Sequence, residues 1–314
     1  MALTRLRVAF GPVAPEFGSW RWLGSDLCDA LSKCCETQVF ERAVPDCDVA
    51  VFIKFKPSAE VLQTLRNRAS LVYCPVDIYG STAEIEADSA SLSSFDLIFA
   101  HCRRLERYFS AFAPVKYLDH PLKYVVPPTD EHVADGPLLW IGNRGNLEPV
   151  VTWVNEIDLS EEIWILTDLP VNAKHPSPGE LGFTSRNRIR VENWTCERHL
   201  AWLRLSRAAL DIKGVDFRSR HKPPAKAFDY LASGLPLAMN QNSSAAEALQ
   251  TMDFRLAAPE NLEYWLSKEY WDATQRLGET LRRELALPRI ARQFADLIHS
   301  AFASSIGRPE FVLT

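Results

Sequence analysis

Residues 211–240 read DIKGVDFRSRHKPPAKAFDYLASGLPLAMN, a stretch with the pattern of a strand, a helix and a second strand. Pro223 and Pro224 suit the first turn of a helix, where the N–H that proline lacks would have no partner in the helix. Gly234 suits the left-handed cap that often ends a helix. The stretch therefore predicts a helix over 223–233 between two strands.

The same alternation of short apolar runs and helical patterns extends over the whole chain. Strand-like runs are expected at 6–10, 49–55, 71–76, 97–100, 115–118, 138–141, 163–166, 189–191, 209–213 and 235–239. Helices are expected at 20–32, 59–68, 103–112, 149–156, 197–207 and 243–249, and from 261 onward. Strands that alternate with helices indicate parallel sheets covered by helices on both faces, which is an α/β fold.

A break in this alternation predicts two domains. Residues 122–136 read LKYVVPPTDEHVADG, without helical or strand periodicity, and are expected to form a linker. The chain of 314 residues is long enough for two doubly wound, Rossmann-like domains, at 1–121 and 137–314. The polar, Pro-rich stretch 171–188 is expected to be a loop. We expect the C-terminal helices to pack back on the first domain.

Composition excludes several classes of protein. The formal net charge is −5, which disfavours a general nucleic-acid binder because such proteins need a broad basic surface. No apolar run approaches the ~20 residues that span a bilayer, and no signal peptide is recognisable, so a cytoplasmic protein is expected. The seven Cys contain no CxxC and the seven His have no ligand spacing, so we expect reduced thiols and no metal site.

The predicted helix at 223–233 carries charge near its N-terminal end. Lys222, Lys226 and Asp229 are spaced along one stripe, and Arg218 precedes them in the loop. Helix N-termini and basic side chains attract phosphate, and a carboxylate beside them can accept hydrogen bonds from a ribose. The stripe is typical of a nucleoside-diphosphate site. The alternative is a solvated Asp–Lys pair on a helix surface.

The segment KAFDYLASGLP at 226–236 resembles the K-x-F-E-Y-x-A-x-G-x-P signature of family 4 glycosyltransferases with the GT-B fold. The resemblance implies two Rossmann-like domains that face each other across a cleft, with a nucleotide-sugar donor on the C-terminal domain. It also implies that Asp229 takes the place of the Glu that binds the nucleotide ribose. Asp is one methylene shorter than that Glu, and His221 stands where the E-x7-E form of the motif has its first Glu.

Other loops that follow predicted strands complete the donor-site hypothesis. The segment LWIGNRGNL at 139–147 exposes backbone N–H groups, and its Arg144 matches the arginine that contacts the diphosphate in the resembled family. That fold also places the first βα loop near the donor phosphates and two later loops around the nucleobase. The candidates for these roles are Gly18 and Ser19 in the first βα loop and Asp168 and Trp194 in the later loops, and Asn143, beside Arg144, is a further candidate for the donor site. Ordinary βα turns and a core tryptophan are the alternatives.

Three residues that follow strands of the N-terminal domain are candidates for catalysis on the acceptor. Asp77 is expected to act as a base or to bind an acceptor hydroxyl; the alternative is a turn or cap residue. His101 and His120 are expected to donate to a phosphate or to move a proton near neutral pH. Satisfied structural histidines are the alternative for both.

The combined prediction is a glycosyltransferase that moves a sugar from a nucleotide-diphosphate donor, most simply a UDP- or GDP-sugar, to an acceptor hydroxyl. The resemblance implies retention of anomeric configuration. Cationic groups would stabilise the leaving diphosphate, so the reaction is expected to be independent of metal and of a cofactor. The acceptor is left open as a glycan, a lipid-linked or small molecule or a protein, and the protein as a monomer or homodimer with peripheral membrane contact open. The alternatives are a catalytically silent GT-B-like binding subunit and a sugar-nucleotide epimerase.

Overall fold

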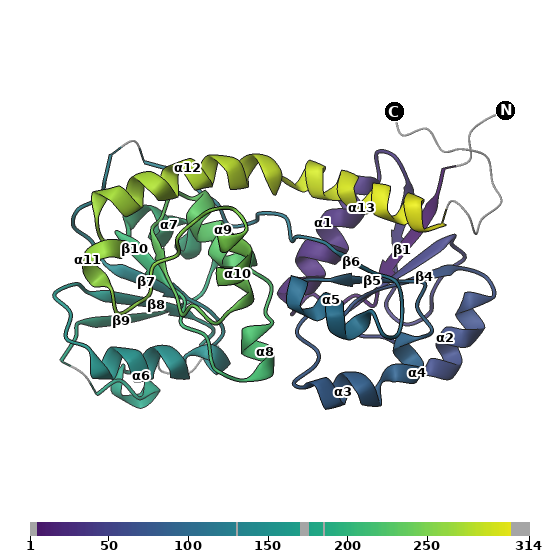
Figure 1. Cartoon of the computed structure of the whole chain (residues 1–314), viewed down its shortest axis with the longest axis horizontal. Coiled ribbons are helices and arrows are strands. Elements are labelled where there is room, and N and C mark those ends of the chain that lie inside the picture. The colour runs from purple at the N-terminus through teal and green to yellow at the C-terminus, as the bar shows by residue number, and fades with distance from the viewer. Residues whose placement is uncertain (1–4, 130, 170–175, 185, 303–314) are drawn as a thin grey trace. The chain divides into compact units, whose positions relative to one another are not determined.

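The computed structural model of the chain consists of two compact units (Figure 1). It describes residues 5–129, 131–169, 176–184 and 186–302. Unit 1 takes the described residues up to Pro121, the segment His221–Pro223 and the residues from Glu284 onward, and unit 2 takes Leu122–Arg220 and Pro224–Arg283. Unit 1 is therefore made of three separate segments of the chain.

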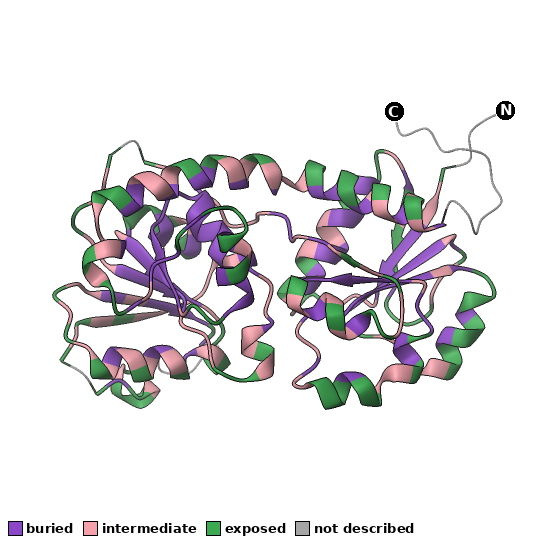
Figure 2. Cartoon of the chain, viewed as in Figure 1, coloured by how far each residue is buried: buried purple, intermediate pink, exposed green. Residues whose placement is uncertain are grey.

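Unit 1 is built on a parallel sheet, sheet A. In the described chain its strands follow the spatial order β2 (Glu36–Val39), β1 (Arg7–Gly11), β3 (Val49–Ile53), β4 (Ser70–Cys74), β5 (Leu97–Ala100) and β6 (Val115–Tyr117). The run VAVFI of β3 is buried along its whole length, as expected for a central strand that is covered on both faces (Figure 2). A strand whose side chains are apolar on both faces is stable only where helices cover both faces of the sheet, which is the case at its centre.

The helices of unit 1 come from both ends of the chain. They are the π-helix η1 (Trp20–Ser25), α1 (Asp26–Leu31), α2 (Ala59–Arg66), α3 (Thr82–Ala87), α4 (Ser89–Leu92), α5 (Arg103–Phe109) and α13 (Leu287–Phe302). Helix α13 packs against α1, and the Phe294 ring lies 5.7 Å from that of Phe10 and 5.1 Å from that of Phe99. Buried apolar side chains recur every four residues from Ile290 to Phe302, which explains why this helix covers a sheet.

Unit 2 contains a second parallel sheet, sheet B. Its described strands follow the order β11 (Leu237–Ala238), β10 (Ala208–Leu210), β7 (Leu138–Ile141), β8 (Ile163–Thr167) and β9 (Ile189–Asn193). Its helices are η2 (Arg144–Asn146), α6 (Glu148–Glu156), η3 (Gly179–Leu181), α7 (Cys196–Leu205), α8 (Phe217–Arg220), α9 (Ala225–Ala232), α10 (Ser244–Gln250), α11 (Leu262–Trp265) and α12 (Lys268–Glu284).

The structure differs from the sequence-based expectations mainly at element boundaries. The expected helix at 20–32 is a π-helical turn followed by α1, and the strand expected at 235–239 is limited to Leu237–Ala238. The linker 122–136 contains no helix or strand among its described residues, and Asp130 lies outside them. Residues 170–175 and 185, at or within the expected loop 171–188, also lie outside the described residues.

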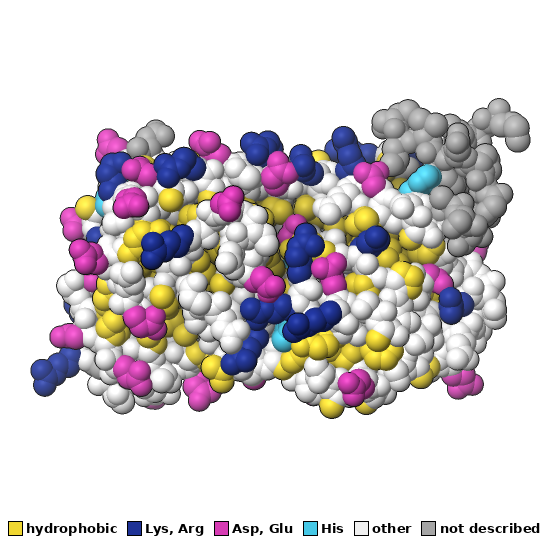
Figure 3. Space-filling view, in the orientation of Figure 1, with side chains coloured by type: hydrophobic (Ala, Val, Ile, Leu, Met, Phe, Trp, Pro, Cys, Tyr) yellow, Lys and Arg dark blue, Asp and Glu magenta, His cyan; other side chains and the backbone are white. Residues whose placement is uncertain are grey.

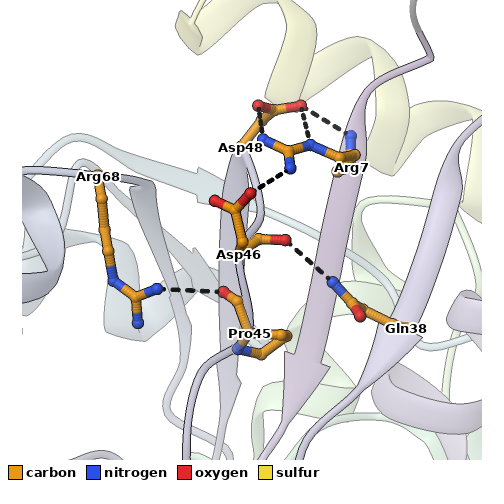
Figure 4. A network of polar contacts seen from close by, with 6 residues as sticks. All are labelled: Arg7, Gln38, Pro45, Asp46, Asp48 and Arg68. Atoms are coloured by element: carbon orange, nitrogen blue, oxygen red, sulfur yellow. Dashed lines mark hydrogen bonds and ion pairs between the residues drawn. The ribbon is translucent and has the colours of Figure 1, made fainter.

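A polar network ties the first strand of sheet A to its neighbours (Figure 4). The Arg7 guanidinium lies 3.0 Å from Asp48 and 2.6 Å from Asp46, and the Arg7 N–H donates to Asp48 at 3.0 Å. Gln38 donates to the Asp46 carbonyl at 3.2 Å. Arg7 begins β1, Asp46 and Asp48 lie just before β3, and Gln38 lies within β2, so this network links three neighbouring strands of sheet A.

The surface drawn in Figure 3 carries cationic and anionic side chains interspersed among apolar ones, without a broad basic field on that face. None of the described helices combines the length and the apolar composition that crossing a bilayer requires.

Candidate functional site

The carboxyl ends of parallel strands meet at one edge of a sheet, and ligands of open α/β sheets bind in the loops beyond that edge. Each unit therefore has one edge at which a ligand is expected to bind. At the carboxyl edge of sheet B, the loops follow Ile141, Thr167, Asn193, Leu210 and Ala238.

A buried carboxylate gathers two ammonium groups at this edge. Asp211 follows β10 directly and is 2% exposed. Its Oδ1 lies 2.5 Å from Lys226 Nζ and its Oδ2 lies 2.7 Å from Lys213 Nζ. Burial raises the pKa of the Asp211 carboxyl, but the two lysines lower it more, so its pKa lies below the usual value. Two cations and one anion leave a net positive charge, which suits an anionic ligand.

The surroundings of this cluster hold both lysines in place. Lys226 Nζ also donates to the Ile141 carbonyl at 2.7 Å and lies 5.2 Å from the centre of the Trp140 ring. The Asn240 amide, which follows β11, accepts the Lys213 N–H at 2.9 Å and donates to its carbonyl at 3.2 Å. The Lys213 backbone and the Lys226 ammonium are therefore positioned before any ligand arrives.

Gly142 permits the close approach of Lys226. A Cβ at Gly142 would lie 2.7 Å from the Trp140 ring and 3.4 Å from Lys226 Nζ, so a side chain there would displace the ring. In the loop that follows, Asn143 and Arg144 are exposed, and the Arg144 N–H donates to the Asp168 carboxylate. Asp168 therefore shapes the loop that carries Arg144, a role that its position in the sequence did not reveal.

Asp229 contacts the linker in this structure. Its Oδ1 accepts the Lys123 N–H at 3.0 Å and its Oδ2 accepts the Tyr124 N–H at 3.3 Å. Burial raises the pKa of Asp229 to about 7, although these two N–H groups act to lower it. A ribose reaches this carboxylate only by sharing or replacing those bonds, so the predicted ribose contact stays a prediction.

Three rings form an aromatic cluster: Tyr124 from the linker, Trp194 from the loop after β9, and His199 from α7. Trp194 Nε1 donates to His199 Nδ1 at 3.2 Å, which leaves the ring proton of the neutral imidazole on Nε2. The Tyr124 ring stacks on His199 with a centroid distance of 4.7 Å and meets Trp194 edge-on at 5.8 Å. Burial, and next the charge of Lys226, lower the pKa of His199 to about 4, so this histidine is neutral at pH 7.

The remaining basic candidates lie before α9. Arg218 is exposed on α8, and Lys222 is half-buried in the segment His221–Pro223, which belongs to unit 1. Among the described residues, no group of three or more His, Cys, Asp or Glu side chains is arranged to hold a metal ion.

The first βα loop of unit 1 is shaped by a tryptophan. Gly18 is exposed, and a Cβ there would lie 2.4 Å from the Trp22 ring, which accounts for the glycine without a ligand. Ser19 is buried just before η1. The role predicted for these two residues in phosphate binding stays a prediction.

The carboxyl edge of sheet A brings the three predicted catalytic residues into one neighbourhood. His101 Nε2 lies 3.9 Å from Asp77 Oδ1 and bonds to the His221 carbonyl at 3.0 Å. A carbonyl only accepts, so Nε2 carries the ring proton. Burial lowers the pKa of His101, and it lowers that of His120 to about 3, with His101 contributing. Both imidazoles are therefore neutral at pH 7.

Sequence reasoning missed several residues of these two edges. They are Lys54 in unit 1, whose Nζ donates to the Val76 carbonyl at 3.1 Å beside Asp77, and Tyr124, His199, Asp211 and Lys213 in unit 2. Asp211 and Lys213 had a local signal, because D-I-K directly follows a buried strand and so falls at a carboxyl edge. Tyr124 and His199 had none, since 75 positions of sequence separate them.

No family model matches the chain, and no curated protein matches it in sequence. Solved structures do resemble it in three dimensions. One is AviGT4, a glycosyltransferase involved in avilamycin A biosynthesis, with a TM-score of 0.56 at 14% identity over 96% of this chain and 99% of that one. A second is an α,α-trehalose-phosphate synthase (UDP-forming) from Burkholderia vietnamiensis, with a TM-score of 0.63 at 12% identity over 95% of this chain and 100% of that one.

A third is a putative UDP-N-acetylglucosamine 2-epimerase from Listeria monocytogenes, with a TM-score of 0.56 at 13% identity over 99% of this chain and 100% of that one. At such low sequence identities, the likeness to these solved structures establishes the fold alone. With its two parallel-sheet α/β units, the chain has the GT-B fold of two Rossmann-like domains.

Proposed function

We propose that the protein is a glycosyltransferase that moves a sugar from a nucleotide-diphosphate donor, of the UDP or GDP type, to an acceptor hydroxyl. The single observation that carries the proposal is the pair of lysines held by Asp211 at the carboxyl edge of sheet B. Its net positive charge and its place beyond the strand ends suit a diphosphate. The nucleotide-sugar enzymes named among its structural neighbours support this choice.

In the proposed reaction, the bond between the sugar C1 and the diphosphate oxygen breaks, and the acceptor oxygen bonds to C1. The departing diphosphate carries developing negative charge, which Lys213, Lys226 and Arg144 would stabilise without a metal ion. The acceptor hydroxyl would lose its proton to Asp77 or to the departing phosphate. We propose retention of configuration on the strength of the family signature at 226–236.

Binding of nucleoside diphosphates tests the donor site. We expect calorimetry to detect binding of one among UDP, GDP, TDP, CDP and ADP. Lys226→Ala should weaken it about ten- to a hundredfold, because a charge-assisted hydrogen bond contributes about 1.5–3 kcal/mol. Lys268→Ala removes an exposed lysine that pairs with Asp272 on α12, and serves as the matched control. Equal affinities for all three proteins would refute the site.

Product analysis separates transfer from the two other activities. With the sugar nucleotide that matches the bound base, a glycosyltransferase forms a new glycoside only when an acceptor is present, and activity persists in EDTA. An epimerase changes the sugar nucleotide without an acceptor. A silent subunit binds the nucleotide and changes nothing. The anomeric proton of the product, read by NMR, decides between retention and inversion.

A further inference from the structure

We propose that Cys34 and Cys35 form a modification site, a dithiol that a hydroperoxide converts reversibly into a disulfide between adjacent residues. The two cysteines lie in the turn between α1 and β2, and the proposed transfer reaction uses neither of them. The inference therefore goes beyond the proposed function and does not depend on it.

The turn after α1 brings the two sulfur atoms to the same side of the chain. Cys34 Sγ lies 3.9 Å from Cys35 Sγ. Successive side chains of an extended strand point to opposite sides, so this proximity results from the turn and not from adjacency alone. A disulfide needs about 2.0 Å between its sulfur atoms, so each of them has to move by only about an ångström.

Backbone hydrogen bonds hold the turn in this conformation. The N–H groups of Cys34 and Cys35 donate to the Leu31 carbonyl at 2.9 Å and 2.8 Å. The Cys34 thiol lies 3.4 Å from the same carbonyl oxygen, to which it donates. The fold therefore fixes where both thiols point before any oxidant arrives.

The two thiols differ in their access to solvent. Cys34 is half-buried, whereas Cys35 is 7% exposed. Burial raises the pKa of Cys35 to about 12, with the neighbouring Cys34 contributing, and the charge of Arg5 acts against this rise. The thiolate is the form that attacks an oxidant, and susceptibility to oxidation follows exposure. Cys34 is therefore the residue that is oxidised first, and Cys35 is the thiol that reacts with it afterwards.

The reaction proceeds in two steps. The Cys34 thiolate attacks one oxygen of the hydroperoxide, the O–O bond breaks, and the departing oxygen takes up a proton, which leaves a sulfenic acid on Cys34. The Cys35 sulfur then bonds to the Cys34 sulfur, the S–O bond breaks, and the hydroxide leaves as water with the Cys35 proton. Two electrons pass from the dithiol to the hydroperoxide, so hydrogen peroxide yields two molecules of water.

The disulfide formed in this way is easily reduced. The Cα atoms of adjacent residues are about 3.8 Å apart across a trans peptide, whereas a disulfide usually joins Cα atoms about 4.4–6.8 Å apart. Such a departure strains the bond, and strained disulfides are the labile and regulatory ones. A thiol reductant therefore restores the dithiol, as a reversible switch requires.

Oxidation acts on the elements that the turn connects. Leu31 ends α1, and the N–H of Glu36, the first residue of β2, donates to the Leu6 carbonyl at 2.9 Å. Closing the S–S bond moves the buried Cys35 side chain and disturbs the two N–H bonds to Leu31. Helix α1 packs against α13 (Figure 1), and β2 is the edge strand of sheet A. We therefore expect oxidation to loosen the end of α1 and the edge strand.

Peptide mapping of the full chain tests the inference. Trypsin cleavage after Lys33 and Arg42 releases CCETQVFER, which contains Cys34 and Cys35 and no other cysteine. After treatment of the folded, reduced protein with hydrogen peroxide, we expect this peptide to have lost two hydrogen atoms. Dithiothreitol should restore both thiols. Cys196→Ser, which removes an exposed cysteine, is the matched control and should give the same peptide as the wild type.

Two variants separate the two steps. In Cys35→Ala the sulfenic acid on Cys34 has no neighbouring thiol to react with, so labelling by dimedone should rise about fivefold or more above that of the wild type. In Cys34→Ser neither dimedone labelling nor loss of hydrogen should occur in the peptide 34–42. Phenylarsine oxide, which bridges two thiols, should bind this peptide segment in the wild type and in neither variant.

Three results would overturn the inference: a peptide 34–42 that keeps both thiols while Cys196 is oxidised, a sulfinic acid as the product in the wild type, or equal dimedone labelling of Cys35→Ala and the wild type. Hydrogen exchange tests the effect on the fold. Oxidation should accelerate exchange in residues 31–39 and leave the strands of sheet B unchanged. Unchanged exchange in residues 31–39 would refute the switch. Calorimetry with nucleoside diphosphates tests the donor site separately.

Discussion

Asp211 and Asp272 are two carboxylates of unit 2 in opposite surroundings. Asp211 is buried between two lysines, whereas Asp272 forms an exposed ion pair with Lys268 one turn away on α12. Removing one partner of a buried ion pair leaves the other charges unpaired away from water, whereas an exposed pair contributes little. Comparing the two sites therefore measures how much burial increases the effect of an ion pair on the free energy of unfolding.

We predict that Asp211→Asn lowers the free energy of unfolding by about 3–5 kcal/mol, and Asp272→Asn by less than about 1 kcal/mol. Denaturant titration at pH 7 measures both. If Asp211→Asn changed the free energy of unfolding as little as Asp272→Asn does, the two lysines would be solvated. The hypothesis that they form a prearranged diphosphate site would then be refuted.

The second prediction at this scale concerns Asp229 and pH. Burial raises its pKa in the folded protein to about 7, above the value of about 3.9 in an unfolded chain. The folded protein therefore holds this proton more tightly, and the associated stability is complete below about pH 4 and is lost as pH rises through 7. An amide in place of this carboxyl, as in Asp229→Asn, does not titrate in this range.

We therefore expect the wild type to lose stability relative to Asp229→Asn between pH 5 and pH 8, by on the order of a few kcal/mol. Denaturant titrations of both proteins at the two pH values give the difference, in which the other titrating groups cancel. Parallel pH profiles would mean that the carboxylate is solvated. The hydrogen bonds to the linker would then not form in solution.

At the scale of elements, the packing of α12 on α9 depends on a glycine. A Cβ at Gly278 would lie 2.6 Å from the Leu231 carbonyl oxygen, which belongs to a helix backbone and cannot easily move. Gly145, by contrast, has no atom within 4 Å of its added Cβ. Only the first glycine is needed for close approach.

We predict that Gly278→Ala destabilises the protein by about 1–3 kcal/mol through overpacking, despite the higher helix propensity of Ala. Gly145→Ala should lie within about 0.5 kcal/mol of the wild type. Thermal unfolding of the two variants provides the comparison. A neutral Gly278→Ala would show that α12 can shift away from α9.

At the scale of the whole molecule, the chain closes unit 1 with its last helix. The buried Phe294 on α13 contacts the rings of Phe10 and Phe99, which stand on β1 and β5. The core of unit 1 is therefore completed by residues almost 300 positions from its first strand. Unit 2 has its own core around sheet B.

We predict that Phe294→Ala costs about 3–5 kcal/mol and that the loss falls on unit 1. Hydrogen exchange followed by peptide mapping should detect faster exchange in β1, β3 and β5, with the strands of sheet B unchanged. Gln293→Ala, its exposed neighbour on α13, is the control. Equal acceleration in both sheets would mean that the units unfold together.

The sequence by itself determined the class of fold, because the alternation of apolar runs and helical periods is a local property that each segment carries. It also placed the helix at 223–233 within two residues of α9, through the prolines before it and Gly234 after it. The resemblance at 226–236 predicted the GT-B architecture, which the structural neighbours confirm.

Only the tertiary structure decided which side chains meet. Asp229 accepts hydrogen bonds from the backbone N–H groups of residues 123 and 124, and His101 bonds to the carbonyl of residue 221. Lys226 on α9 pairs with Asp211, which follows β10. These contacts depend on strand order and on how helices pack, which no local period encodes. Periodicity states which face of an element is buried, whereas the partner of a buried polar group is set by the whole fold.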